Sequence, residues 1–125
     1  MTMNHTLLLI AAGGMAGSLC RYLVHTLIMK NYAHIFPAGT FIVNATGCLL
    51  IGILWGLSQK HSGMNANLQA LLMIGFCGAY TTFSAFTLEN LQLIEKGHAL
   101  TALLYSTLSM VTGILLTYVG YWIVK

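Results

Sequence analysis

The stretch GFCGAYTTFSAF, residues 75–86, places hydroxyl and aromatic side chains inside an otherwise apolar run. Phe83 and Phe86 are three residues apart and therefore share one face of a helix. Thr82 and Ser84 add hydroxyl groups around that face, and hydroxyl groups can donate hydrogen bonds to an anion. Phenylalanines at this spacing are also typical of helix packing or lipid contact, so the stretch alone leaves both interpretations open.

A second stretch, GTFIVNATG at residues 39–47, carries an amide in a similarly apolar setting. Thr40, Asn44 and Gly47 lie on one face if this segment is helical. An amide inside a membrane needs hydrogen-bond partners, which Asn44 can find on a neighbouring helix or in a passing anion. The sequence leaves these two roles open.

Glu89 and Arg21 are the ionisable residues that lie well inside apolar segments. Such residues are functional candidates by default, although either can instead anchor a helix near the membrane surface. The three cysteines lack CxxC spacing and the five histidines include no i, i+4 pair, so the sequence indicates neither a disulfide framework nor a zinc site. Hydroxyl groups also recur along the last apolar segment, at Ser106, Thr107, Ser109 and Thr112.

The composition places these candidates in a membrane. Of the 125 residues, 58% are hydrophobic and only 6% are charged, which lies outside the usual range of soluble globular proteins. The net charge of +3 comes from five scattered basic residues, too few to form a nucleic-acid-binding surface. We therefore expect a membrane protein and exclude nucleic acid as a partner.

Four apolar runs are long enough to cross a bilayer, whose hydrocarbon core of roughly 30 Å needs about 20 residues of helix. The predicted spans are His5 to Met29, Gly39 to Leu57, Leu68 to Glu95 and Ala99 to Val124. The connections between them are short and polar. We therefore expect an all-α membrane protein in which residues 1–125 form a single domain with four transmembrane helices.

Glycine spacing predicts close contacts between these helices. Gly13 with Gly17, and Gly52 with Gly56, have the small-xxx-small spacing that allows helix backbones to approach one another. Gly97, which follows Lys96 between the last two spans, is a plausible helix C-cap.

The third run is longer than one untilted span requires, and Gly75 and Gly78 lie near its middle. We expect this helix to be broken near its middle into two half-helices. Because an unsatisfied backbone group in hydrocarbon costs several kcal/mol, such a break must be buried in protein or line a polar cavity. Freed carbonyls can then coordinate a cation, and freed N–H groups favour an anion. A continuous helix with packing glycines is the alternative.

The basic residues give only a weak signal for orientation. Lys60 and Lys125 are expected on one side of the membrane, and Lys30 and Lys96 on the other, with Arg21 nearer the second side. Because these charges nearly cancel, we expect the chain to insert in both orientations, which makes an antiparallel homodimer possible. A single orientation set by other features is the alternative.

Together these stretches resemble the small bacterial Fluc (CrcB) fluoride channels. The similarity rests on Gly13-Gly14 through Arg21-Tyr22, on GTFIVNATG, on GFCGAYTTFSAF with Glu89 beyond it, and on Tyr105 with Ser109. It covers nearly the whole chain. It implies a dual-topology antiparallel homodimer with two pores, passive and highly selective export of fluoride, and a location in the bacterial inner membrane.

The resemblance also implies a role for each candidate residue. Phe83 and Phe86 correspond to the phenylalanines that line the fluoride path, and Asn44 to the pore asparagine. The backbone carbonyls of Gly78 and Thr81 match the positions that hold a structural sodium ion on the dimer axis. The remaining pore, polar-track and vestibule positions are Thr40, Thr82, Ser84, Tyr105, Ser109, Arg21 and Glu89.

Two positions depart from the family pattern. Ala79 stands where a second glycine is frequent, and Ala85 stands where threonine is frequent, so one polar-track hydroxyl is missing. These departures bear on the conductance rather than on the class of function.

Three other functions fit less well. A small multidrug exporter is also a four-span chain capable of dual topology, but it needs a carboxylate deep in the first span, which has none. A non-transporting assembly subunit would use the glycines and hydroxyls only as helix contacts. An intramembrane enzyme is disfavoured because the histidines lie near the termini or in loops, away from Cys77 and Ser84.

Overall fold

The computed structural model describes residues 3–60 and 63–125, and within these ranges every regular element is a helix. The elements are α1 (Met3–Met29), α2 (Ala38–Ser58), α3 (Ala66–Gln69), the π-helix η1 (Ala70–Cys77), α4 (Gly78–Tyr80), α5 (Phe83–Glu95) and α6 (Ala99–Val124). We call residues 66–95, from α3 to α5, the third segment. Helices α1, α2 and α6 and the third segment are long and apolar enough to cross a membrane. The all-α class and the four predicted spans are therefore confirmed.

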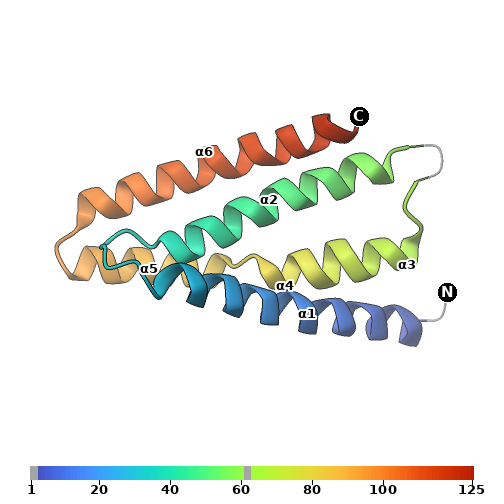
Figure 1. Cartoon of the computed structure of the whole chain (residues 1–125), viewed down its shortest axis with the longest axis horizontal. Helices are drawn as coiled ribbons and strands as arrows, with labels where there is room; N and C mark the ends of the chain where they lie inside the picture. The colour runs from blue at the N-terminus through green and yellow to red at the C-terminus, as the bar shows by residue number, and fades with distance from the viewer. Residues whose placement is uncertain (1–2, 61–62) are drawn as a thin grey trace.

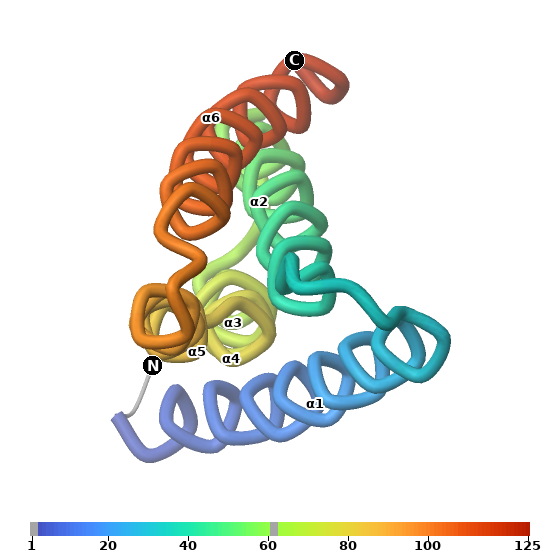
Figure 2. The backbone as a smooth tube through the Cα atoms, turned by 90° about the vertical axis from the view of Figure 1, so that its left-hand side faces the viewer, coloured from blue at the N-terminus to red at the C-terminus, as the bar shows by residue number. Residues whose placement is uncertain are grey.

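The four segments associate in two pairs (Figure 1). Helix α2 packs along α6, and α1 packs along η1 of the third segment. Figure 2 shows the third segment lying between α1 and the α2–α6 pair.

Glycines allow both pairs to approach closely. A Cβ atom at Gly13 or Gly17 of α1 would collide with the backbone of η1, and one at Gly52 or Gly56 of α2 would collide with α6. Both predicted small-xxx-small pairs therefore lie at helix contacts.

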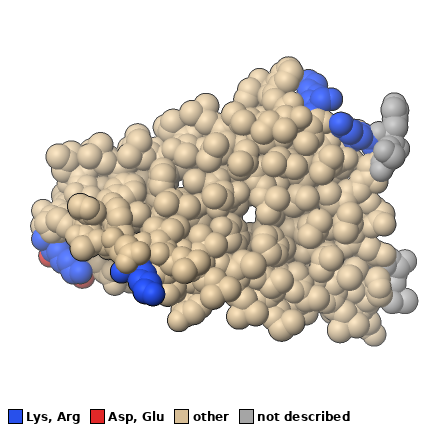
Figure 3. Space-filling model, in the orientation of Figure 1, with Lys and Arg blue, Asp and Glu red and all other residues tan. Residues whose placement is uncertain are grey.

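Most of the surface of these helices is apolar and uncovered. Between 11% and 33% of the residues in each membrane-length apolar window are buried. On the face shown in Figure 3, the charged side chains gather at the two ends and leave a broad uncharged middle. This distribution is that of a multi-pass membrane protein, whose charges avoid the bilayer core.

The backbone of the third segment leaves helical geometry at Thr81 and Thr82. Thr81 has φ −79° and ψ 157°, and Thr82 has φ −147° and ψ 121°, so both residues are extended between α4 and α5. Gly75 and Gly78, at which the sequence suggested an irregularity, are themselves helical. Gly75 instead packs against the α1 backbone at Ile10 and Gly13, a contact that requires the absence of a side chain.

The ends of α5 are both capped. The hydroxyl of Thr82 accepts a hydrogen bond from the backbone N–H of Ala85 at 3.2 Å, so Thr82 is the N-cap. At the other end, Gly97 has φ +80°, and the N–H of His98 donates to the carbonyl of Leu93. This is a Schellman ending, and it confirms the predicted role of Gly97.

Candidate functional site

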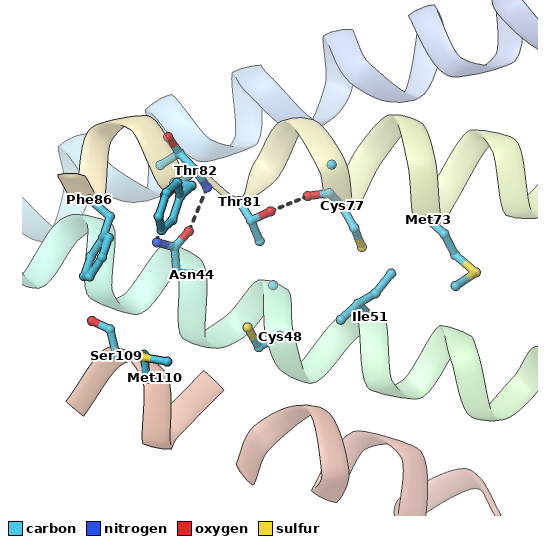
Figure 4. A pocket seen from close by; sticks show the side chains of 13 residues that line it. Asn44, Cys48, Ile51, Met73, Cys77, Thr81, Thr82, Phe86, Ser109 and Met110 are labelled. Carbon is cyan, nitrogen blue, oxygen red and sulfur yellow. Dashed lines mark hydrogen bonds between the residues drawn. The ribbon is translucent and has the colours of Figure 1, made fainter. Parts of the chain in front are cut away.

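A cavity of about 430 Å³ lies between α2, the third segment and α6 (Figure 4). We call it the central cavity. It brings together seven of the residues selected from the sequence: Asn44, Gly78, Thr81, Thr82, Phe83, Phe86 and Ser109. The remaining wall residues were not selected, and they are Gly47, Cys48, Ile51, Met73, Cys77 and Met110. Most of these have apolar or weakly polar side chains, which nothing in the sequence distinguishes from ordinary packing residues.

Asn44 joins α2 to the extended part of the third segment. Its Nδ2 donates to the carbonyl of Thr82 at 3.0 Å, and its Oδ1 accepts from the N–H of Thr82 at 2.8 Å. The amide therefore satisfies both backbone groups of a residue that lies outside a helix. Of the two roles left open by the sequence, the structure shows the interhelical one, and one N–H of the amide is left for a further partner.

Three aromatic rings form a row from the open side of the cavity into the core. The ring centroids of Phe83 and Phe86 are 5.8 Å apart, and those of Phe86 and Tyr105 are 5.0 Å apart. Phe83 is 78% exposed, Phe86 is half-buried and Tyr105 is completely buried. The row thus leads from the molecular surface to the innermost side chain of the α5–α6 contact.

Glu89 lies next to Tyr105, the innermost ring of this row, and both of its carboxylate oxygens accept hydrogen bonds. The hydroxyl of Thr40 donates to Oε1 at 2.6 Å, and the hydroxyl of Tyr105 donates to Oε2 at 2.7 Å. Thr40 comes from α2, Glu89 from α5 and Tyr105 from α6. Because the donors are both buried, these hydrogen bonds hold the carboxylate in one position at the junction of three helices.

The hydroxyl group of Ser109 has no hydrogen-bond partner among the residues that the structure describes. Its Oγ is buried and is the one side-chain polar atom of this kind among the residues that the structure describes. Two neighbouring hydroxyls on α6 are satisfied, since Ser106 donates to Asn90 and Thr107 donates to the Leu103 carbonyl. A buried hydroxyl without a partner is costly unless it meets a ligand or water, and that of Ser109 lies in the cavity wall.

Two predicted residues lie outside both the cavity wall and the group formed by Thr40, Glu89 and Tyr105. Ser84 is exposed, and its hydroxyl lies 3.3 Å from that of Thr82, which does line the cavity. Arg21 is half-buried on α1, apart from the cavity wall. The candidates thus form three groups. They are the wall of the central cavity, the carboxylate clamp of Thr40, Glu89 and Tyr105 beside it, and the two outlying side chains.

Sequence reasoning missed two polar contacts that support this arrangement. The hydroxyl of Ser106 donates to Asn90 at 2.9 Å and links α6 to α5. The hydroxyls of Thr46 and Tyr80 lie 2.8 Å apart and link α2 to α4. The sequence shows that these amide and hydroxyl groups lie inside apolar spans, but the residues next to them in the sequence do not identify their hydrogen-bond partners.

Comparison with known proteins decides the family. Residues 8–121 match the family described as "CrcB-like protein, Camphor Resistance (CrcB)". The chain belongs to the CrcB family. The chain is 43% identical over 120 residues to a protein of Flavobacterium psychrophilum named "Fluoride-specific ion channel FluC", with 96% of this chain and 97% of that protein covered.

Other relatives carry the same name. A CrcB relative from Azobacteroides pseudotrichonymphae is 42% identical over 113 residues, covering 90% of each chain. Another, from Maridesulfovibrio salexigens, is 48% identical over 100 residues, covering 79% of each chain. Both are named "Fluoride-specific ion channel FluC". The CrcB family is thus one of ion channels, and the chain is not an enzyme.

Proposed function

We propose that this chain is a fluoride channel whose permeation path passes through the central cavity. The observation that carries the proposal is the buried hydroxyl of Ser109, which has no partner within residues 3–60 and 63–125 and shares the cavity wall with Asn44 and Phe86. Fluoride is a small and strongly hydrated anion, so a selective path must replace its water with directed hydrogen-bond donors. The hydroxyl of Ser109 and the remaining N–H of Asn44 are donors of this kind.

The phenyl rings supply the weak contacts with the anion along the path. Ring edges carry the positive rim of the aromatic quadrupole, so Phe83 and Phe86 attract an anion without holding it firmly. Conduction requires this weakness, because an ion that binds tightly leaves slowly. Thr82 and Ser84 add hydroxyls beside Phe83, and Thr40, Tyr105 and Glu89 border the path where the aromatic row ends. We assign Arg21 to the outer approach.

We propose further that two copies assemble as an antiparallel homodimer with two pores. Phe83 lines the cavity but is 78% exposed in the single chain, so the cavity of a lone chain would open to lipid. A second copy would close it with protein. Two-fold symmetry then produces two equivalent paths.

The dimer also provides a place for a structural sodium ion. We interpret the extended Thr81–Thr82 pair as the expected break in the third helix. The carbonyls of Gly78 and Thr81 accept no hydrogen bond from the described residues, so both fit a hard cation that binds oxygen. One chain supplies only this pair, and a second copy would supply an equal pair across the axis. When bound, the ion neutralises carbonyl dipoles that lie near the anion path.

Transport is passive and outward in this proposal. A cytoplasmic membrane with a negative interior drives an anion out with about 2.3 kcal/mol per charge at 100 mV, so no pump is needed. We place residues 1–125, as a single domain, in the bacterial inner membrane, because only there does this potential act on cytoplasmic fluoride.

Fluoride efflux from potassium-loaded liposomes tests the proposal. Valinomycin relieves the charge that anion efflux leaves behind, and chloride efflux is measured in parallel. We expect rapid release of fluoride, no release of chloride, and a strong loss of fluoride release in the Phe83→Ile and Phe86→Ile variants. Absence of fluoride release from folded wild-type protein would reject the channel, and normal release by both variants would reject the aromatic path.

A further inference from the structure

A second cavity, of about 360 Å³, lies at one end of the helical bundle. We call it the end cavity. Its walls come from the last turn of α1, the connection between α1 and α2, the C-terminal half of α5, and the start of α6. Figure 1 shows these four parts meeting at one end of the molecule. The proposed function assigns no role to this cavity.

Titratable side chains line the end cavity from three elements and one loop. They are His25 of α1, His34 of the connecting loop, Glu89 and Lys96 of α5 and its cap, and His98 at the start of α6. Helix α2 contributes no titratable group to the wall. Three of the five histidines in the chain therefore border one space, although they are far apart in the sequence.

The histidines of the end cavity are not sealed from solvent, since His34 is exposed and His25 and His98 are half-buried. The ring of His34 lies 4.9 Å from that of Tyr32, and the ring of His25 covers Gly39 at the start of α2. Neither of these contacts is a hydrogen bond, so within the described residues they leave the ring nitrogens of His25 and His34 without a hydrogen-bond partner. The His, Cys, Asp and Glu residues within 3–60 and 63–125 include no group of three placed to hold a metal ion. Protonation is thus the chemistry that these three side chains offer.

The charge of the end cavity depends on these histidines. Two helices begin and two end at the cavity, so their dipoles largely cancel. Lys96 carries one positive charge and Glu89, held by Thr40 and Tyr105, carries one negative charge. The wall is therefore close to neutral while the imidazoles are neutral, and it gains up to three positive charges when they are protonated. Histidine is the side chain that makes this change between about pH 5 and pH 8.

The end cavity lies next to the proposed fluoride path. Phe86 lines the central cavity and Glu89, one helical turn later on α5, lines the end cavity. Tyr105 touches both residues, through its ring on Phe86 and its hydroxyl on Glu89. An anion that passes the aromatic row would thus emerge in the end cavity.

We propose that the end cavity binds small anions when His25, His34 and His98 are protonated, and that it thereby raises fluoride flux at acid pH. The inference rests on the proposed function, because it needs a fluoride path to act upon. A cavity lined by one sign of charge concentrates counter-ions at its mouth and raises their rate of entry roughly tenfold or more. We expect fluoride flux per protein to rise roughly tenfold between about pH 8 and about pH 5.5 in low salt.

The test is fluoride efflux from liposomes with equal pH on both sides, after subtraction of the leak of protein-free liposomes at each pH. We expect the His25→Gln, His34→Gln, His98→Gln triple variant to keep the wild-type flux at about pH 8 and to lose the rise at about pH 5.5. His5→Gln is the matched control, because His5 lies on α1 far from this cavity, and it should keep the rise. If the triple variant does not fold, His34→Gln with His98→Gln should still remove most of the rise.

Ionic strength supplies a second test of the mechanism. The acid-dependent rise should shrink in high concentrations of an impermeant salt, because screening weakens the attraction of fluoride to charged histidines. Wild-type flux that is equal at both pH values, a rise that survives in the triple variant, or a rise that salt leaves unchanged would overturn the inference. Each of these results leaves the channel itself intact, whereas no fluoride flux at any pH would reject the proposed function.

Discussion

Asn44 connects α2 to the two extended residues of the third segment, and its removal tests this connection. Asn44→Ala abolishes both hydrogen bonds to Thr82 and leaves its backbone groups unsatisfied. We expect the free energy of unfolding to fall by about 2 kcal/mol, since each hydrogen bond contributes about 1 kcal/mol. Fluoride flux should fall more steeply, because a donor in the cavity wall is lost as well. Thermal unfolding in detergent and liposome efflux measure the two effects.

Asn67→Ala is the matched control for this substitution. Asn67 is exposed on α3 and lies outside the central cavity. Its replacement should change neither stability nor flux. An Asn44→Ala protein with wild-type stability would contradict the bracing role that we assign to the amide.

Tyr105 tests whether the position of Glu89 matters. Tyr105→Phe keeps the ring packed against Phe36 and Phe86 but removes the hydroxyl that donates to Glu89. We expect fluoride flux to fall roughly tenfold or more, which corresponds to the loss of about 1.5 kcal/mol or more from one hydrogen bond to the charged carboxylate. With the hydrogen bond from Tyr105 lost, the Glu89 carboxylate is held by Thr40 alone, so it moves toward the fluoride path and repels the anion.

Tyr118→Phe provides the comparison for Tyr105→Phe, because Tyr118 is 58% exposed on α6 and lies apart from Glu89. Its flux should equal that of the wild type. Equal flux in the two variants would show that the clamp on Glu89 has no part in permeation.

At the scale of the elements, the contact between α1 and η1 depends on individual glycines. A Cβ atom at Gly17 would collide with the backbone of Phe76, whereas one at Gly14 would make ordinary contacts at 3.9 Å. Gly17→Ala should therefore destabilise the protein by about 1–3 kcal/mol, as overpacking does. Gly14→Ala should instead stabilise the protein by about 0.5–1 kcal/mol, because alanine is favoured over glycine inside a helix and this site has room for the methyl group. Thermal unfolding of the two variants in the same detergent measures the difference, and equal melting temperatures would contradict the packing.

The elements also show what the sequence can predict. Hydrophobic run length fixed the four spans to within two residues at each end, because a bilayer constrains helix length directly. The break expected near the middle of the third helix stays a prediction, and the residues there with an extended backbone are Thr81 and Thr82 rather than Gly75 and Gly78. The extended pair is stabilised by Asn44, which is 38 residues away, so the local pattern carries no signal for it.

The candidate site was predictable only in part for a similar reason. Residue types and family resemblance selected seven wall residues of the central cavity and also Thr40, Glu89 and Tyr105, but they did not predict the hydrogen bonds that join these last three. Of the titratable residues that line the end cavity, Glu89 alone was predicted as a site residue. The three histidines of this cavity are dispersed along the sequence, and only the packing of helix ends brings them to one space.

At the scale of the whole molecule, the proposed antiparallel dimer depends on a balance of charge between the two ends. Positive side chains lie at both ends of the bundle (Figure 3), and an excess of Lys and Arg normally keeps one end in the cytoplasm. Shifting the balance should fix the orientation. Lys60→Gln with Lys125→Gln should bias the chain one way, and Lys30→Gln with Gln59→Lys and Asn67→Lys should bias it the other way.

Each biased variant should fail to export fluoride when it is produced alone, because all copies then insert with the same orientation and no antiparallel pair can form. Production of both variants in one cell should restore export, since each supplies the orientation that the other lacks. Intracellular fluoride, measured with an electrode after lysis of fluoride-loaded cells, reports export, and reporter fusions at the C-terminus report orientation. Full export by either variant alone, with its orientation shown to be uniform, would rule out the antiparallel dimer. If cells that produce both variants do not export fluoride although both orientations are present, then insertion in two orientations is not sufficient for activity.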